Sequence, residues 1–250
     1  MTSNKPDLSV FKKFNFESPP VGVKFLYHKP EDIERLDKNL AFCQMIKEAQ
    51  KRRIPFFADA ANHACGAALY VLGEELPEII EAGYLGPAYK IYKEARVNRR
   101  VYYNGIPRLE KNTAKYVAFS PLNQISADPD LLIVLTDNAS QTEILLRAMS
   151  YTTGEMWSSK TTNVLGCAWL YAYPYITGQL NYVVTGLGYG MKVRKVFPEN
   201  RQLISIPFDW LATITQNLRE MVWVLPGYTD QRDQFYQQVY KELGLPPPQL

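Results

Sequence analysis

The sequence predicts an α/β protein with mixed sheets, and three observations lead to this fold class. Short apolar runs such as 131–136 alternate with stretches whose apolar residues recur every three to four positions. Asparagine caps and glycine stops bracket several of these helical stretches, as at Asn163 and Gly154. The 250 residues, of which 46% are hydrophobic and 21% charged, suffice for a substantial core.

The elements of the first half follow from local signals. Pro19-Pro20 stops any helix, so residues 1–18 are expected to form a polar arm before a strand at 21–27. Apolar residues form one stripe over 40–53, which predicts a helix, and a short strand follows at 54–58. Asn62 is a good helix cap for a helix that Gly73 stops. We then expect a helix or strand at 78–84, a basic helix at 88–100 and a strand at 115–122.

The second half begins with the purely apolar run 131–136, which is typical of a strand covered on both faces. Asn138 caps a helix over 139–151, and 155–161 is expected to be a strand. A helix capped by Asn163 runs to about residue 173, and strands follow at 180–185 and 202–207. Helices at 209–221 and 231–243 precede a tail at 246–250.

The order of elements is similar in two halves, about 19–122 and 123–222, which predicts an internal duplication of a βαβα unit. We therefore expect one α/β domain over 19–245, made of two related halves and a C-terminal helix. Two such halves usually pack about a pseudo-twofold axis. The helix at Asn62 matches the helix at Asn163, so Cys65 and Cys167 are expected to approach one another at this axis.

The three cysteines are too few for a disulfide framework. Cys65 falls in the first turn of its predicted helix, two residues after His63, where free N–H groups favour a thiolate nucleophile. Cys43, Cys65 and Cys167 together fit an iron–sulfur cluster with one open iron, or a zinc site with His63. Their spacing is no metal-ligand motif, and free cysteines are often small core residues. All these alternatives stay open.

A glycine-rich loop suggests a different kind of site. Gly186, Gly188 and Gly190 follow a predicted strand and precede Arg194. Backbone N–H groups of such a loop can hold a phosphate or carboxylate, with the guanidinium completing the site. The spacing matches neither dinucleotide-binding nor Walker A motifs, and a tight turn explains the glycines equally simply. The rival function is thus a metal-free protein that binds an anionic small metabolite.

The composition limits the classes of binding partner and the location that we expect for this protein. A net charge of +3 is too small to indicate nucleic acid. The N-terminus has no apolar signal core, and the longest apolar run, 164–176, is broken by Pro174 and too short to span a membrane. We expect a cytoplasmic protein that acts on or binds a small organic molecule, with a homo-oligomer left open. Two histidines provide little for a histidine-based hydrolase.

Four motifs occur in order between residues 18 and 222: 20–25 (PVGVKF), 42–44 (FCQ), 62–66 (NHACG) with 72–73 (LG), and Cys167 followed by 174–178 (PYITG). Together they resemble an uncharacterised prokaryotic family, domain of unknown function 169, the ArCR-type proteins. The resemblance implies no settled activity, but the family occurs largely in anaerobes and archaea, which suits an oxygen-sensitive cofactor. Members often carry a cysteine in the stretch matching 183–194. This chain has none there, so a closed four-cysteine site is excluded by count.

Overall fold

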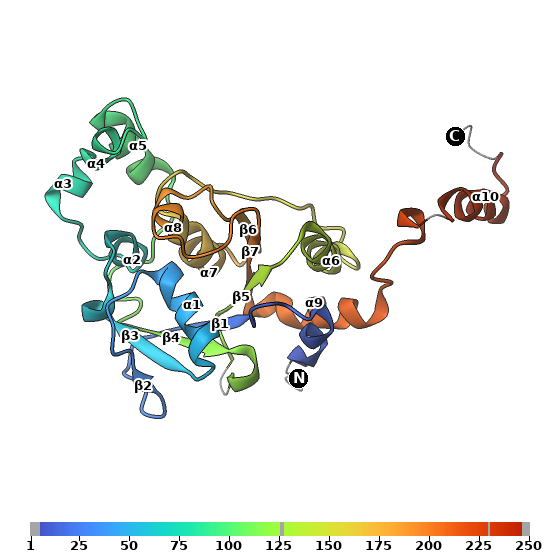
Figure 1. The fold of residues 1–250 in the computed structure, drawn as a ribbon, viewed down its shortest axis with the longest axis horizontal. Coiled ribbons are helices and arrows are strands. Elements are labelled where there is room, and N and C mark those ends of the chain that lie inside the picture. The colour runs from blue at the N-terminus through green and yellow to red at the C-terminus, as the bar shows by residue number, and fades with distance from the viewer. Residues whose placement is uncertain (1–5, 126–127, 230, 247–250) are drawn as a thin grey trace.

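A seven-stranded mixed sheet organises the fold in the computed structural model, which describes residues 6–125, 128–229 and 231–246. The strand order is β2-β3-β4-β1-β5-β7-β6 (Figure 1), and only the β2–β3 pair is parallel. The strands are β1 (Val21–Leu26), β2 (Glu34–Arg35), β3 (Phe56–Asp59), β4 (Tyr116–Pro121), β5 (Leu131–Thr136), β6 (Asn181–Val184) and β7 (Gln202–Pro207). The predicted mixed α/β class is confirmed.

The helices are α1 (Phe42–Arg52), α2 (Gly66–Val71), α3 (Glu78–Glu81), α4 (Leu85–Ala88), α5 (Ala95–Gly105), α6 (Ala139–Ser150), α7 (Tyr173–Thr177), α8 (Tyr189–Val193), α9 (Phe208–Glu220) and α10 (Arg232–Glu242). Short turns of 3-10 helix are η1 (Leu8–Phe14), η2 (Ala60–Asn62), η3 (Leu122–Gln124) and η5 (Pro226–Tyr228), and η4 (Ala168–Ala172) is a π-helical turn. The helix predicted over 88–100 is found only from Ala95 onward, as α5, and Lys90 before it has a non-helical φ of 57°.

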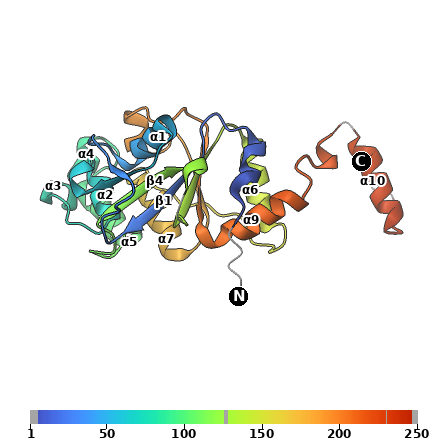
Figure 2. The same ribbon diagram turned by 90° about the horizontal axis from the view of Figure 1, so that it is seen from below.

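Strand β5 separates two apolar clusters. Leu131, Ile133 and Leu135 pack into a first cluster with α1, α2 and η4, whereas Leu132 and Val134 pack into a second cluster with η1, α6 and α9. Successive side chains of a strand point to opposite faces, so the two clusters lie on opposite sides of the sheet. All six residues of β5 are buried, as predicted for a strand covered on both faces. Figure 2 shows η1, α6 and α9 gathered on one side.

The predicted internal duplication is not shown. Residues 155–161 are an exposed irregular segment and not the predicted strand. There the N–H of Lys160 donates to the side-chain Oδ1 of Asn181 at 2.9 Å and not to a strand backbone. In the predicted duplication the strand 21–27 and the helix 40–53 of the first half correspond to the strand 131–136 and the helix 139–151 of the second, but the helices found there, α1 and α6, belong to clusters on opposite faces. A twofold axis relating the antiparallel neighbours β1 and β5 would instead place both helices on one face.

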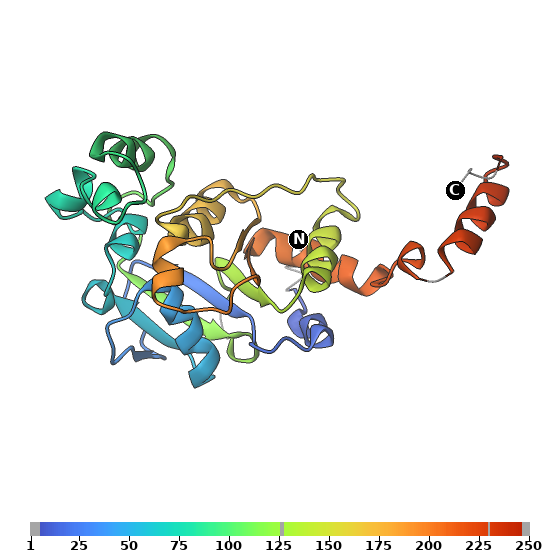
Figure 3. The ribbon, with the colours of Figure 1, turned by 45° about the horizontal axis from the view of Figure 1, so that its top comes forward.

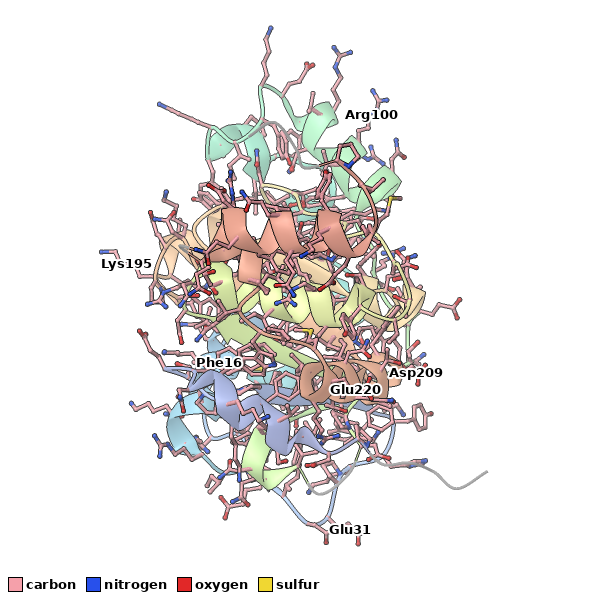
Figure 4. The ribbon with its side chains drawn as sticks, turned by 90° about the vertical axis from the view of Figure 1, so that its right-hand side faces the viewer. Phe16, Glu31, Arg100, Lys195, Asp209 and Glu220 are labelled. Carbon is pink, nitrogen blue, oxygen red and sulfur yellow. The ribbon has the colours of Figure 1, made fainter. Side chains whose placement is uncertain are left out.

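The two ends of the chain differ in their packing. Within the predicted arm 1–18, the described part forms η1, whose Val10, Phe11 and Phe14 are buried in the second cluster. Figure 4 views this side, with Phe16 after η1 and Asp209 and Glu220 at the ends of α9. Helix α10 contacts η5, has no buried residue and lies away from the body (Figure 3). Of the predicted tail 246–250, residues 247–250 fall outside the described residues.

None of the helices in the described parts of the chain combines the length and apolar character that crossing a membrane requires.

Candidate functional site

A cavity of about 570 Å³ lies between α2, α5 and α8 and is called here the α2–α8 cavity. Its polar wall consists of Cys65, Asn98, Tyr102, Tyr89, Tyr189 and Arg194. The rest of the lining is apolar or glycine: Ala64, Gly66, Leu76, Ile80, Leu85, Gly86, Ile91, Val164, Leu165, Gly190 and Val193. The cavity therefore joins two residues predicted for different sites, Cys65 and Arg194. Figure 3 shows the small helices α2 to α5 forming a group beside the main body.

The charge of this cavity comes from one side chain. Among the residues that the structure describes, Arg194 is the only charged one on the wall, and no carboxylate lines it. The guanidinium Nη1 donates to the backbone oxygen of Gly190 at 3.1 Å, and Arg194 forms no ion pair with any described residue. By contrast, the basic side chains of Arg100 and Lys195 point outward (Figure 4). An anion in the cavity would meet a cation that has no protein carboxylate to compete for it.

Helix α8 is placed by glycines that allow close packing. A Cβ atom added at Gly166 or Gly188 would lie 2.9 or 3.1 Å from the methyl carbon of Met191, so these glycines let Met191 sit against the chain before η4. The N–H of Tyr189 donates to the backbone oxygen of Asn163 at 2.8 Å. Met191 and Tyr189 thus fix the direction from which α8 presents Arg194 to the cavity.

The predicted glycine loop divides into two roles. Gly190 lines the cavity with Arg194, whereas Gly186 has a φ of 89° and forms the turn after β6. The N–H groups of Leu187 and Tyr189 are already bonded to the oxygens of Val184 and Asn163. These two N–H groups are not free to hold an anion, which leaves the guanidinium of Arg194 as the charged group for an anion.

Asn98 provides a polar group deep in the wall. Its side chain is fully buried, and Nδ2 donates to the backbone oxygen of Gly83 at 3.0 Å, which fixes the orientation of the amide. Oδ1 has no hydrogen-bond partner among the described residues. Burial raises the pKa of the neighbouring Tyr102, and an interaction with the Asn98 side chain lowers it in part. A buried acceptor without a partner is unfavourable, so a donor brought by a ligand would stabilise this wall.

The aromatic part of the wall comes from α8 and the loop after α4. The rings of Tyr89 and Tyr189 stack with centroids 5.3 Å apart and an interplanar angle of 28°. Both residues line the cavity. Stacked phenol rings offer apolar faces and polar edges, which suits a planar organic molecule. In the sequence, the alternating aromatic residues over 169–175 suggest either core packing or a ring-lined pocket beside Cys167, and nothing singles out Tyr89 or Tyr189.

Cys65 faces the cavity from a helix shorter than predicted. Asn62 does not cap a helix over 62–72, because its side chain is buried and binds elsewhere. Its Oδ1 accepts from the N–H of Asp59, and its Nδ2 donates to the backbone oxygens of Leu36 and Lys38 at 2.8 and 3.0 Å. The six-residue α2 starts after Cys65, which is the N-cap residue. The predicted first-turn position of Cys65 is therefore wrong.

Cys43 and Cys167 instead form a pair in the first cluster. The hydrogen bond from the Cys167 thiol lowers the pKa of Cys43, and the charge of Arg194 and the N–H of Gln44 act in the same direction. The same hydrogen bond and burial raise the pKa of Cys167 well above its ordinary value. Cys43 lies in the first turn of the 11-residue α1. The thiolate environment predicted for Cys65 is thus found at Cys43.

The sequence contains one recognisable signal for the first turn of α1. The side-chain Oε1 of Gln44 accepts from the N–H of Ala41 at 3.0 Å, one half of a capping box. A glutamine at this position is the sequence signal of a helix start just before Cys43. The prediction began the helix at Leu40 and so placed Cys43 beside the apolar stripe and not at the helix end.

The predicted three-cysteine metal site is not supported. In the stretches of chain that the structure describes, no group of three or more Cys, His, Asp or Glu side chains could hold a metal ion. Cys65 faces the cavity, whereas Cys43 and Cys167 pair with one another in the core. The iron–sulfur cluster and the zinc alternative with His63 therefore have no assembled ligand set here.

His63 is held in apolar surroundings. Both ring nitrogens are buried and have no hydrogen-bond partner among the described residues. The ring meets Phe42 edge-on, with centroids 4.8 Å apart and an interplanar angle of 84°. Burial lowers the pKa of His63 to about 4, against a small opposing effect of Asp59. The imidazole is therefore neutral at pH 7 and packs as a core group, away from the wall of the cavity.

Comparison with known proteins agrees with the resemblance seen in the motifs. A family model described as uncharacterised ArCR, domain of unknown function 169, matches residues 11–217. An uncharacterised protein of Methanocaldococcus jannaschii is 27% identical over 124 residues, which cover 48% of this chain and 52% of that protein. The chain thus spans about half the length of this curated relative. No solved structure matches the chain.

Proposed function

The chain belongs to the uncharacterised ArCR family, domain of unknown function 169, and because this description names no activity, we propose from the cavity that the protein binds a small organic anion. The ligand is an aromatic or otherwise planar carboxylate or phosphate that carries a hydrogen-bond donor away from its charge. The observation that carries this proposal is Arg194, which is the only charged side chain among the described residues that line a mostly apolar and phenolic cavity.

The size of the cavity supports a ligand of metabolite size. A volume of about 570 Å³ falls within the range of roughly 300–1,000 Å³ that small-molecule sites occupy. Apolar side chains such as Leu76 and Ile80 would cover the body of the ligand, and the Tyr89–Tyr189 stack would contact a flat face. These contacts contribute affinity but do not distinguish a charged ligand from an uncharged one. The selection of an anion depends on Arg194.

The buried amide of Asn98 supports the second half of the proposal. Oδ1 of Asn98 is an acceptor without a partner, so a ligand hydroxyl or amine would satisfy it. Arg194 directly follows α8 as its C-cap residue and Asn98 lies on α5, so the two polar groups approach the cavity from different parts of the chain. A ligand with an anionic end and a donor end would use both groups.

Binding can be tested with matched probes. Phenylacetate, 3-phenylpropionate and 4-phenylbutyrate, each with its para-hydroxy partner and its uncharged amide, would be titrated by calorimetry and ligand-observed NMR. We expect the acids to bind and the amides to bind at least about tenfold more weakly, since one partly solvated charged hydrogen bond contributes roughly 1.4 kcal/mol. Equal binding of acids and amides, or no binding of any acid, would refute the proposal.

Two variants of α8 and its flank sharpen this test. Arg194→Gln removes the charge on the cavity wall and is expected to weaken the acids about tenfold without affecting the amides. Lys192→Gln is the matched control, because Lys192 lies on the same short helix, pairs with Glu199 and does not line the cavity. If both variants weaken the acids equally, a general positive field and not Arg194 holds the anion.

A second candidate function is catalysis by Cys65, because this thiol is the only one of the three on the cavity wall. A thiol beside a bound organic ligand can attack an electrophilic carbon of that ligand. Iodoacetamide labelling at neutral pH tests its reactivity, and the acid probes are expected to protect Cys65 from labelling.

Anaerobic purification with iron and sulfide analysis tests the predicted iron–sulfur cluster independently. A colourless, iron-free protein from anoxic cells would remove that prediction.

A further inference from the structure

Two cysteines that the proposed ligand site does not use lie together in the core. Cys43 stands in the first turn of α1, and Cys167 directly precedes η4. Both thiols are free, both are buried, and the two are in hydrogen-bonding contact. This contact joins two elements that are far apart along the chain, so only the fold brings the sulfur atoms together.

The elements that carry the two cysteines are locked to one another beside the pair. The hydroxyl of Tyr171 donates to the backbone oxygen of Phe42 at 3.1 Å, and the rings of these two residues have centroids 4.7 Å apart. Phe42 is the neighbour of Cys43, and Tyr171 lies one helical turn after Cys167. The thiol pair therefore belongs to a well-packed junction and not to a mobile surface.

The surroundings of the pair favour chemistry over simple packing. Cys43 lies at the positive end of the dipole of an 11-residue helix and accepts a hydrogen bond from the Cys167 thiol. The positive charge of Arg194 also acts on it. These groups stabilise a thiolate at Cys43 while Cys167 stays protonated and acts as the donor. A nucleophilic thiolate next to a protonated thiol is the arrangement in which a disulfide forms and opens readily.

The pair also borders the proposed ligand site. The charges of Arg194 and Cys65, two residues on the cavity wall, act on Cys43 and Cys167 respectively. A small reagent that enters the α2–α8 cavity would therefore reach the neighbourhood of the pair without crossing the sheet. Cys65, which is half-buried on that wall, is the more accessible thiol but has no thiol in hydrogen-bonding contact.

We propose that Cys43 and Cys167 form a reversible intramolecular disulfide by exchange with a low-molecular-weight disulfide. The Cys43 thiolate attacks one sulfur of the small disulfide, forms a mixed disulfide and releases one small thiolate. That thiolate takes the proton of Cys167, whose sulfur then attacks the sulfur of Cys43 and releases the second small thiolate. Counted from the two thiols, the protein loses two electrons and two protons: Cys43 gives its proton to solvent when it forms the thiolate, and Cys167 gives its proton to the first small thiolate. The second small thiolate takes a proton from solvent, so the small disulfide becomes two thiols. The reverse steps open the bond.

Exchange with oxidised glutathione tests the proposal on the full chain. The protein would be equilibrated in glutathione buffers of increasing oxidised fraction, quenched with an alkylating reagent and mapped by mass spectrometry. We expect two of the three thiols to be lost together, a cross-linked peptide containing Cys43 and Cys167, and Cys65 alkylated or carrying a single glutathione. Excess dithiothreitol is expected to restore all three thiols.

Single substitutions separate this pair from the third thiol. Cys65→Ser is the matched control and should form the same cross-link at the same oxidised fraction. Cys43→Ser and Cys167→Ser should each lose it, and Cys167→Ser should retain a mixed disulfide at Cys43. If these two variants fail to fold, the peptide map of the wild-type protein still decides. A cross-link that involves Cys65, or no cross-link in the folded, equilibrated protein, overturns the proposal.

Discussion

Acidification is expected to destabilise this protein through one side chain, His63. Both ring nitrogens are buried without hydrogen-bond partners, and the ring packs edge-on against Phe42. Protonation in the native state would place a charge in these apolar surroundings, so burial lowers the pKa of His63 to about 4 from an ordinary 6.5. In the unfolded chain the same imidazole is hydrated and takes up its proton at the ordinary pKa.

The sign and size of the effect follow from this difference. Below pH 6.5 the unfolded state binds a proton that the native state does not, so the free energy of unfolding falls as the pH falls. The loss grows until the pH reaches about 4, where the native state also becomes protonated. One pKa unit corresponds to about 1.4 kcal/mol, so the full difference is about 3 kcal/mol.

Urea unfolding followed by tryptophan fluorescence measures this loss at several pH values between about 7 and 4.5. We expect the wild-type midpoint to fall with pH and the midpoint of His63→Leu to fall much less, since leucine has no proton to bind. His28→Gln serves as the control, because His28 is exposed and should leave the wild-type slope unchanged. If His63→Leu and the wild type show the same slope, the buried neutral imidazole is not the cause.

Three further predictions concern the core and the thiol pair. Asn62→Ala should lower the free energy of unfolding by about 3 kcal/mol, measured by urea, because the buried carbonyl of Leu36 and the partly buried carbonyl of Lys38 lose their donor. Gly73→Ala should lower it by roughly 2 kcal/mol or more, since Gly73 has a φ of 79° and an added Cβ would lie 2.4 Å from a backbone oxygen. Arg194→Gln should slow the alkylation of Cys43 at neutral pH, because loss of the positive charge raises the pKa of that thiol; unchanged alkylation would exclude Arg194 as a cause.

The sheet could be predicted from the sequence where strand signals are local. The runs 131–136 and 202–207 coincide with β5 and β7, because unbroken apolar or alternating patterns within a strand are enough to identify it. The region between α2 and β4 was predicted poorly. Its short helices are positioned by contacts between residues that are not close in the sequence, such as the hydrogen bond from Asn98 to the backbone oxygen of Gly83. The periodicity of apolar residues carries no information about such contacts.

The helix start at Asn62 shows why local signals can mislead. Asparagine is a strong cap in isolation, but here its side chain binds carbonyls more than twenty residues earlier, at Leu36 and Lys38. These partners exist only after the chain has folded back beside η2. The three-residue displacement of the helix changed the predicted chemistry, since it moved Cys65 out of the first turn.

The candidate site was predictable in its charged and sulfur-containing residues and not in its shape. Arg194 and Cys65 stood out because cations after glycines and cysteines near helix starts are rare, recognisable patterns. Asn98 and the Tyr89–Tyr189 stack gave no such signal, because their importance depends on burial and on a partner from another element. The sequence analysis grouped Cys43, Cys65 and Cys167 at one metal site and did not predict that Cys43 and Cys167 would pair without Cys65.

The division of the core by β5 has a consequence for how the protein can move. The α2–α8 cavity and the thiol pair belong to the side of the first cluster, whereas η1, α6 and α9 belong to the other side. Helices α2 to α5 can loosen to admit a ligand while the opposite layer keeps the sheet in register. Amide exchange should therefore be fast in α2 to α5 and slow in α6 and α9, and ligand should slow only the former. We therefore expect opening of the cavity to involve α2 to α5 and to leave the sheet unchanged.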